Sequence, residues 1–280
     1  MKKIIILILA LSSIIQAKMQ VCVSITPQKF FVKKIAGDLV DVEVLVKEGS
    51  SPATYTPKPS QLKTIAKSKL YFTIDVAFEK NWLDRFKSIN ANLKLVDTTQ
   101  GIKKVSMLEH HHHEKEEVHK EGLDPHIWLD PIFVIEQVTT ISDALSKQDK
   151  KNEEIYSTNK DNFIKEIYAL DKEIKEMLKD VKNRKFIVFH PSFGYFCRRY
   201  NLTQIAIERE GKEPSVKYLK KVIDFATTNS IKRVFVAPQF SQKSAKQIAK
   251  QINGKVITVN PLAYNWDENI EQIAKSFKGN

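Results

Sequence analysis

The sequence predicts an α/β protein of two similar lobes, each built on a parallel sheet, joined by one long rigid helix with a ligand cleft between the lobes. Three observations lead to this prediction. Short β-branched runs alternate with amphipathic runs early in the chain, the same alternation returns near residue 185, and an unbroken helical pattern separates the two sets. Strands that alternate with helices pair in parallel, and ligands bind at the carboxyl ends of such strands.

Residues 1–17 have the layout of a secretory signal peptide. Two lysines precede an apolar run from Ile4 to Leu11, and small and polar residues lead to Ala17. The run is too short to span a bilayer as a permanent helix, and no cysteine directly follows it, which argues against a lipid anchor. We expect cleavage after Ala17 and a mature protein in the periplasm. The alternatives are an uncleaved anchor or a buried strand.

The first lobe is expected over residues 18–150. Its strands are rich in β-branched residues, and the runs between them carry apolar residues at helical spacing. The expected strands are 19–26, 41–49, the second half of 61–75, and 93–99. Residues 109–121 interrupt the pattern with histidine and glutamate and have no apolar spacing, so we interpret them as a flexible insertion. From Pro131 the chain resumes helix.

The connecting helix is expected over residues 151–182 and the second lobe over residues 183–280. Apolar residues recur at spacings of three and four, or multiples of them, and no Gly or Pro interrupts the stretch, so it forms one helix roughly 45 Å long. They are Ile155, Phe163, Ile167, Leu170, Ile174, Leu178 and Val181. In the second lobe, helices alternate with four expected strands, 185–190, 203–208, 233–238 and 255–260.

Composition limits the possible function. The chain has 280 residues, of which 42% are hydrophobic, enough for one or two buried cores. The net charge is +12, but the lysines are scattered among glutamates without interleaved aromatic residues, which favours a solvated basic surface over a nucleic-acid interface. Cys22 and Cys197 lie in different halves, so we expect two buried free thiols. We also expect the protein to be a monomer.

Two histidines are the candidate metal ligands. His190 stands at the carboxyl end of the strand 185–190, and His126 stands in "DPHIWLDP", after a turn and before a helix. A lone histidine at such a place is more often structural, but imidazoles from two lobes can converge on one ion across a cleft. Neutral imidazole suits Zn²⁺, and its ring needs an acceptor to orient it. Asp124 or Asp130 is expected to serve His126.

Six segments extend this interpretation over nearly the whole mature chain. They are, in order, "GSSPATYTPKPSQ", "DPHIWLDP", "VFHPSFGYFCRRYNL", "EGKEPSVKYL", "FVAPQFSQKSAKQIA" and "VNPLA". Together they resemble the periplasmic metal-binding proteins of zinc and manganese ABC transporters, the cluster A-I solute-binding proteins. The resemblance implies a metal at the lobe interface, no catalysis, and delivery to a membrane ABC permease. The histidine-rich insertion and His190 resemble the zinc-transporting members, so Zn²⁺ is expected rather than Mn²⁺.

The resemblance leaves the ligand set incomplete. His126 and His190 match ligand positions of the family, whereas Ala53 stands where a histidine is usual and Asn260 where many members have an acidic residue. A glutamate common in the family is replaced by Ala237. Zinc takes about four ligands. Three possibilities remain, in order of preference: Asn260 and a water complete the site, His119 of the insertion folds over it, or the two histidines are relics.

Other residues near the expected cleft are not expected to be ligands of the tight site. Tyr55 is expected to be a packed ring, and Glu208, Glu210 and Glu213 are expected to be solvated or helix-capping charges rather than substitute ligands. His110, His111, His112, His113 and His119 form an accessory tract that we interpret as a weak zinc chelator. Its binding is expected to fade as falling pH protonates the imidazoles.

Two rival functions belong to other classes. A metal-dependent hydrolase also uses histidines, carboxylates and an open coordination position. The chain has no "HExxH" motif, no Gly-rich phosphate loop and no recognisable Ser/His/Asp set. A surface adhesin built on the same fold is the second rival. The sequence favours a binding protein over both.

Overall fold

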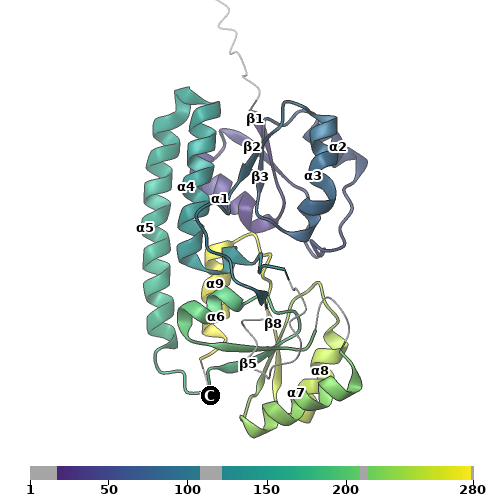
Figure 1. Ribbon diagram of the computed structural model, residues 1–280. Coiled ribbons are helices and arrows are strands. Elements are labelled where there is room, and N and C mark those ends of the chain that lie inside the picture. Colours follow the sequence, from purple (N-terminus) through teal and green to yellow (C-terminus); the bar gives the residue numbers. More distant parts are fainter. Residues whose placement is uncertain (1–17, 108–121, 209–213, 279–280) are drawn as a thin grey trace, which may run out of the picture.

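The computed structural model describes residues 18–107, 122–208 and 214–278, and its two α/β lobes are stacked along one long helix (Figure 1). The expected signal peptide and the histidine-rich tract 109–121 lie outside the described residues. The predicted fold class is confirmed. Within the described residues, no helix is both long enough and apolar enough to cross a bilayer.

The first lobe is a four-stranded parallel sheet. Its strands are β1 (Met19–Val23), β2 (Val40–Val44), β3 (Leu70–Thr73) and β4 (Lys94–Asp97), in the order β2-β1-β3-β4. All four residues of β3 are buried, because helices cover both faces of the sheet. Figure 1 shows α2 (Pro59–Ile65) and α3 (Ala77–Ile89) on one face, with α1 (Thr26–Ala36) and α4 (Pro131–Gln148) on the other.

The second lobe repeats this arrangement. Its strands are β5 (Lys185–Val188), β6 (Thr203–Ala206), β7 (Arg233–Val236) and β8 (Lys255–Thr258), in the order β6-β5-β7-β8. All pairings are parallel. The helices are α6 (Gly194–Tyr200), α7 (Val216–Thr228), α8 (Gln242–Gln251) and α9 (Trp266–Lys275). The strand order of each lobe is the same relative to its first strand, so the lobes are similar, as predicted.

The connection between the lobes is the expected long helix, and a second helix lies beside it. The long helix is α5 (Glu153–Leu178), 26 residues or roughly 39 Å, and a short 3-10 turn, Lys150–Asn152, separates it from α4. Helix α4 runs antiparallel beside α5 along the first lobe, and α5 alone continues past the second lobe (Figure 1). The expected range 151–182 contains α5 and not α4. The sequence did not predict that α4 packs against α5, because the spacing of apolar residues along one helix does not reveal which other helix it contacts.

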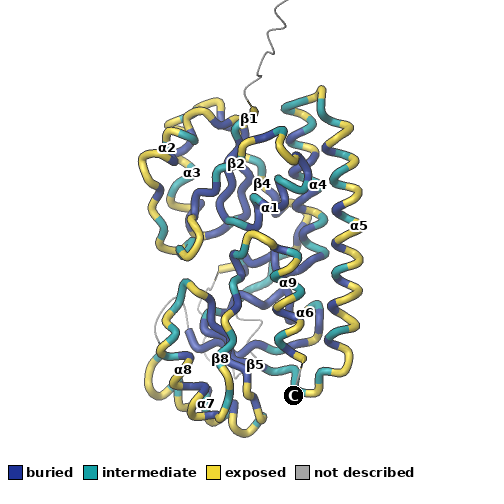
Figure 2. The backbone as a smooth tube through the Cα atoms, turned by 180° about the vertical axis from the view of Figure 1, so that it is seen from behind, coloured by how far each residue is buried: buried dark blue, intermediate teal, exposed yellow. Residues whose placement is uncertain are grey.

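The C-terminal segment crosses back to the first lobe. The ring of Trp266, at the start of α9, packs edge-on against Phe31 of α1 and Phe163 of α5, at centroid distances of 5.4 and 6.2 Å. Figure 2 shows α9 between the two sheets and beside α5. One continuous buried cluster therefore includes residues of both lobes.

Two tryptophan hydrogen bonds close the junction. The indole of Trp128 donates to the carbonyl of Pro261 at 2.8 Å, and the indole of Trp266 donates to the carbonyl of Trp128 at 2.6 Å. The two bonds tie the segment "DPHIWLDP" to the loop that follows β8 and to the first residue of α9, and so hold the lobes together.

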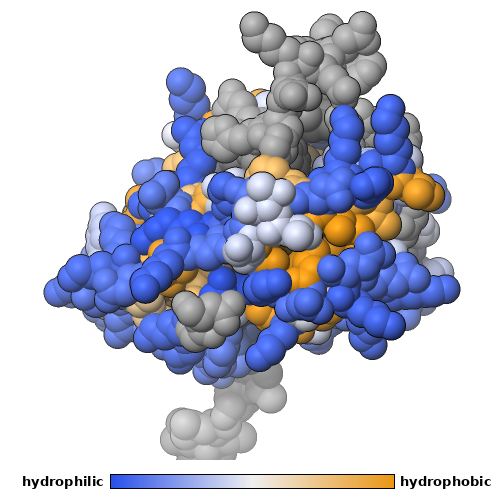
Figure 3. Space-filling view, turned by 90° about the horizontal axis from the view of Figure 1, so that it is seen from below, coloured by the Kyte–Doolittle hydropathy of each residue, from blue (hydrophilic) through white to orange (hydrophobic). Residues whose placement is uncertain are grey.

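Two compositional predictions also have structural outcomes. Cys22 and Cys197 are both buried and free, as predicted, and the Cys22 thiol contacts the Ser68 hydroxyl at 3.1 Å. Hydrophilic side chains cover most of the face seen in Figure 3, which accords with a solvated surface.

Candidate metal centre

His126 lies at the junction of the lobes, held by Asp124. The Asp124 carboxylate accepts from the His126 backbone N–H at 2.9 Å and contacts its Nδ1 at 2.6 Å. Asp124 is fully buried and His126 is 9% exposed. Asp130, the other expected partner, instead caps α4 by accepting from the Ile132 N–H at 2.9 Å, and it pairs with Arg199. The structure therefore assigns Asp124, not Asp130, as the group that orients the His126 ring.

His190 follows β5 and is oriented in the same way from the second lobe. Its Nδ1 lies 3.3 and 3.2 Å from the two carboxylate oxygens of Glu208, and its ring stacks on Phe240 at 5.1 Å. Glu208 is 6% exposed, so the expectation of a solvated or capping charge is wrong for this residue. Strands β5 and β6 are parallel neighbours, and their carboxyl ends bring His190 and Glu208 together.

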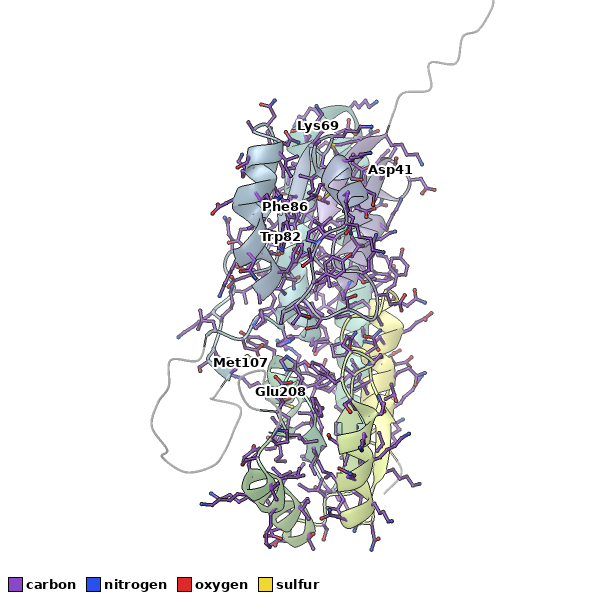
Figure 4. All side chains as sticks on the ribbon, turned by 90° about the vertical axis from the view of Figure 1, so that its right-hand side faces the viewer. Asp41, Lys69, Trp82, Phe86, Met107 and Glu208 are labelled. Carbon is purple, nitrogen blue, oxygen red and sulfur yellow. The ribbon has the colours of Figure 1, made fainter. Side chains whose placement is uncertain are left out.

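The two imidazole rings lie edge to face. Their centroids are 5.3 Å apart and their planes meet at 67°. Figure 4 shows Glu208 at the level where the two lobes meet. Because each Nδ1 donates to a buried carboxylate, the neutral ring carries its proton on Nδ1 and keeps a lone pair on Nε2. Two such Nε2 atoms from opposite lobes can bind one divalent ion.

Asn260 is placed less favourably for a ligand. Its side-chain oxygen accepts from Gln239 Nε2 at 3.2 Å and from the Leu262 N–H at 3.1 Å, so both of its lone pairs are engaged. Its backbone carbonyl also accepts from Asn269 Nδ2 at 2.9 Å. Through these hydrogen bonds, Asn260 stabilises the conformation of the loop after β8. Within the described ranges, no group of three or more His, Cys, Asp or Glu side chains is arranged to hold a metal.

The residues that stand at two of the family's usual ligand positions, Ala53 and Ala237, have side chains that cannot bind a metal. Ala53 is exposed in a turn, where its N–H donates to Ser51 Oγ at 3.2 Å. Tyr55 packs against Phe78 at 6.0 Å and donates its hydroxyl to Gln61 at 2.9 Å, as expected of a packed ring. Ala237 is buried, its carbonyl accepts from the N–H of Phe240 at 3.0 Å, and its methyl side chain offers no ligand atom. His110, His111, His112, His113, His119, Glu210 and Glu213 lie outside the described residues.

Sequence reasoning missed the aromatic surroundings of the pair. Phe240 stacks under His190, and Trp128 lies 5.2 Å from the His126 ring. Phe240 follows β7, the strand next to β5, so its position after a central strand was a usable signal. These rings limit the orientations open to the two imidazoles.

Two similar parallel-sheet lobes joined by a long helix, with paired imidazoles at their junction, define the class of two-lobed α/β proteins. The chain belongs to the family described as "ZnuA: Zinc-uptake complex component A periplasmic", whose model matches residues 21–278.

Individual relatives support this assignment. Zinc-binding protein AdcA of Streptococcus pyogenes serotype M3 is 30% identical over 262 residues, covering 88% of this chain and 51% of AdcA. High-affinity zinc uptake system protein ZnuA of Bacillus subtilis is 29% identical over 252 residues, covering 88% of this chain and 79% of that protein. A crystal structure of ZnuA has a TM-score of 0.86 at 43% identity, covering 93% of this chain and 98% of that one. The chain spans about half the length of the streptococcal relatives.

Proposed function

We propose that this protein captures a divalent metal ion, Zn²⁺ rather than Mn²⁺, in the periplasm and delivers it to a membrane ABC permease. The observation that carries the proposal is the pair His126 and His190, with ring centroids 5.3 Å apart and each Nδ1 held by a buried carboxylate. The zinc-binding and zinc-uptake names of the relatives support the choice of metal and partner. We further propose that the protein acts as a monomer.

The donor set favours zinc on chemical grounds. Imidazole nitrogen is a good ligand for Zn²⁺, whereas Mn²⁺ is better served by oxygen ligands. Asp124 and Glu208 orient the rings and bring two carboxylates close to the bound dication. The pair therefore combines neutral nitrogen ligands with nearby charge compensation.

The remaining coordination positions are filled, in this proposal, by water and by one further group. Asn260 can serve only by giving up its hydrogen bond from Gln239 or from Leu262, because both lone pairs of its oxygen are engaged. His119 of the insertion is the alternative ligand. The tract His110, His111, His112 and His113 is proposed as an accessory chelator that gathers zinc weakly.

The engagement of the buried carboxylates argues against the hydrolase alternative. A catalytic zinc site needs a general base beside the open coordination position. Asp124 and Glu208 are instead bound to the imidazole Nδ1 atoms. The adhesin alternative requires a partner surface on the outside of the molecule, whereas the paired histidines lie at the lobe junction.

Zinc titration of the mature chain tests the proposal. Competition with a chromophoric chelator is measured for the wild type, His190→Ala, His119→Ala and a variant lacking residues 109–121. One tight site is expected in the wild type, lost in His190→Ala and kept in the deletion variant, because the paired imidazoles carry it. Equal tight binding by His190→Ala contradicts the proposal. Loss of the tight site in His119→Ala identifies His119 of the insertion as one of the ligands. Parallel titrations with Mn²⁺ are expected to show weaker binding.

A further inference from the structure

Tyr195 makes two hydrogen bonds that join the two lobes beside the paired histidines. It lies in the first turn of α6, five residues after His190, and is 2% exposed. Its hydroxyl donates to the carbonyl of Asp124 at 2.9 Å and accepts from the N–H of Val105 at 3.2 Å. A hydroxyl has one donor and two acceptor sites, so both bonds are compatible with one proton position.

The two groups that Tyr195 contacts belong to one closed backbone unit. The Asp124 N–H donates to the Val105 carbonyl at 2.8 Å, and an antiparallel bridge between Ser106 and Leu123 follows directly. On the side of the first lobe, Lys104 pairs with Asp75 at 2.5 Å. The unit is thus tied to the first lobe by Lys104 and to the second lobe by Tyr195.

Tyr195 is connected to both imidazoles, to His126 through Asp124 and to His190 through the start of α6. Asp124 holds the His126 ring through its carboxylate, while α6 begins immediately after the turn that carries His190. The Tyr195 ring itself is fixed by an edge-on contact with Phe133 of α4 at 5.4 Å. A shift of the hydroxyl therefore moves Asp124, and with it His126, relative to His190.

We propose that Tyr195 is a positioning residue that sets the separation and orientation of the His126 and His190 rings by fastening Asp124 to helix α6. It touches no metal and acts through Asp124. The inference rests on the proposed function, because bound metal reports on the geometry of the pair.

The test is the substitution Tyr195→Phe, which keeps the ring against Phe133 and removes the hydroxyl that makes both bonds. We expect a Kd for Zn²⁺ about tenfold higher, mainly through faster dissociation, since loss of groups that orient ligands weakens metal sites by roughly 10–100-fold. With Co²⁺ in place of Zn²⁺, the visible d–d absorption is expected to change in position and intensity, because the ligand geometry changes.

The matched control is Tyr200→Phe in the same helix. The Tyr200 hydroxyl donates to Asp171 at 3.0 Å, a carboxylate of α5 that has no part in the site. This variant is expected to lose stability and to keep the wild-type Kd and Co²⁺ spectrum. Wild-type affinity and spectrum in Tyr195→Phe, or equal changes in both variants, overturn the inference. His190→Ala, measured alongside, separates the failures: if it keeps tight zinc binding, the proposed function falls together with this inference.

Discussion

At the scale of single residues, two buried carboxylates from opposite lobes each orient one imidazole. Asp124 and Glu208 each hold the Nδ1 of one imidazole, and each is almost inaccessible to solvent. A carboxylate in such a place fixes the tautomer and strengthens the nitrogen that is left for the metal. The pair of histidines is therefore a unit of four side chains.

Glu208→Gln tests the charge of this unit. Glutamine still offers a carbonyl oxygen to Nδ1 but removes the negative charge, so zinc affinity is expected to fall about 10–100-fold. Chelator competition measures the change. Glu43→Gln is the control, since Glu43 forms a surface pair with Lys47 at 2.8 Å. Unchanged affinity in Glu208→Gln would show that the charge plays no part.

A third buried carboxylate, Glu79, has a different role. Its oxygens accept from the N–H groups of Ile74 and Asp75 at 2.8 and 2.7 Å and from the Ser24 hydroxyl. Burial outweighs these bonds and raises the pKa of Glu79 from its ordinary 4.5 to about 7. The folded protein therefore binds this proton more tightly than the unfolded chain does.

The stability of the metal-free protein is expected to reflect the raised pKa of Glu79. The contribution is fully present below pH 4.5 and is lost as the pH rises through about 7, because ionisation is penalised only in the folded state. The loss amounts to as much as about 3 kcal/mol, since each tenfold change in proton affinity corresponds to about 1.4 kcal/mol. Glu79→Gln is expected to lack this dependence in urea unfolding between pH 5 and 8. Parallel curves for variant and wild type contradict the assignment.

At the scale of elements, α4 is anchored by its first turn. Asp130 caps the N-terminus of α4 by accepting a hydrogen bond from the Ile132 N–H. The same carboxylate forms an ion pair with Arg199 of α6 and so connects the two helices. Asp124, six residues earlier, serves the imidazole instead. The two acidic residues of "DPHIWLDP" thus have separate structural and ligand-orienting roles.

Paired substitutions are expected to separate these roles. Asp130→Asn keeps a capping oxygen and loses the ion pair, so the free energy of unfolding is expected to fall by roughly 1–3 kcal/mol with little change in zinc affinity. Asp124→Asn is expected to weaken zinc binding about 10–100-fold. Urea unfolding and chelator competition on both variants measure the two effects. A larger loss of affinity in Asp130→Asn would reverse the assignment.

At the scale of the whole molecule, one buried cluster extends through both lobes, and a second cluster lies within the second lobe. Trp266 reaches from the end of the chain to α1 and α5, and its hydrogen bond to Trp128 joins it to the segment that carries His126. A core shared in this way couples the stability of the lobes.

Calorimetry of the metal-free mature protein is therefore expected to show one cooperative transition, with equal calorimetric and van't Hoff enthalpies. Trp266→Ala is expected to lower the free energy of unfolding by about 3–5 kcal/mol and to keep a single transition at lower temperature. Two separated transitions in the wild type would contradict a shared core.

Local pattern was enough for the alternating architecture and for the place of His190 at the rim of its sheet, whereas the role of the two histidines as ligands stays a prediction. The alternation of strands and helices predicts parallel sheets, and a histidine at the end of a strand is delivered to the rim of its sheet, as seen for His190 after β5. The role of Glu208 was misjudged because its burial comes from neighbours far along the chain. Asp124 could not be separated from Asp130, since both are close enough to His126 in sequence.

The sequence by itself determined the alternating elements, the free buried thiols and the residue types that suit zinc. Only the tertiary structure decided that α4 pairs with α5 and that α9 returns to the first lobe. It also decided that Asp124 and Glu208 hold the two imidazoles and that Tyr195 bonds to Asp124. The reason is physical. Periodicity and turn chemistry act between neighbours along the chain, whereas burial, ring orientation and hydrogen bonds across the junction depend on how distant segments pack.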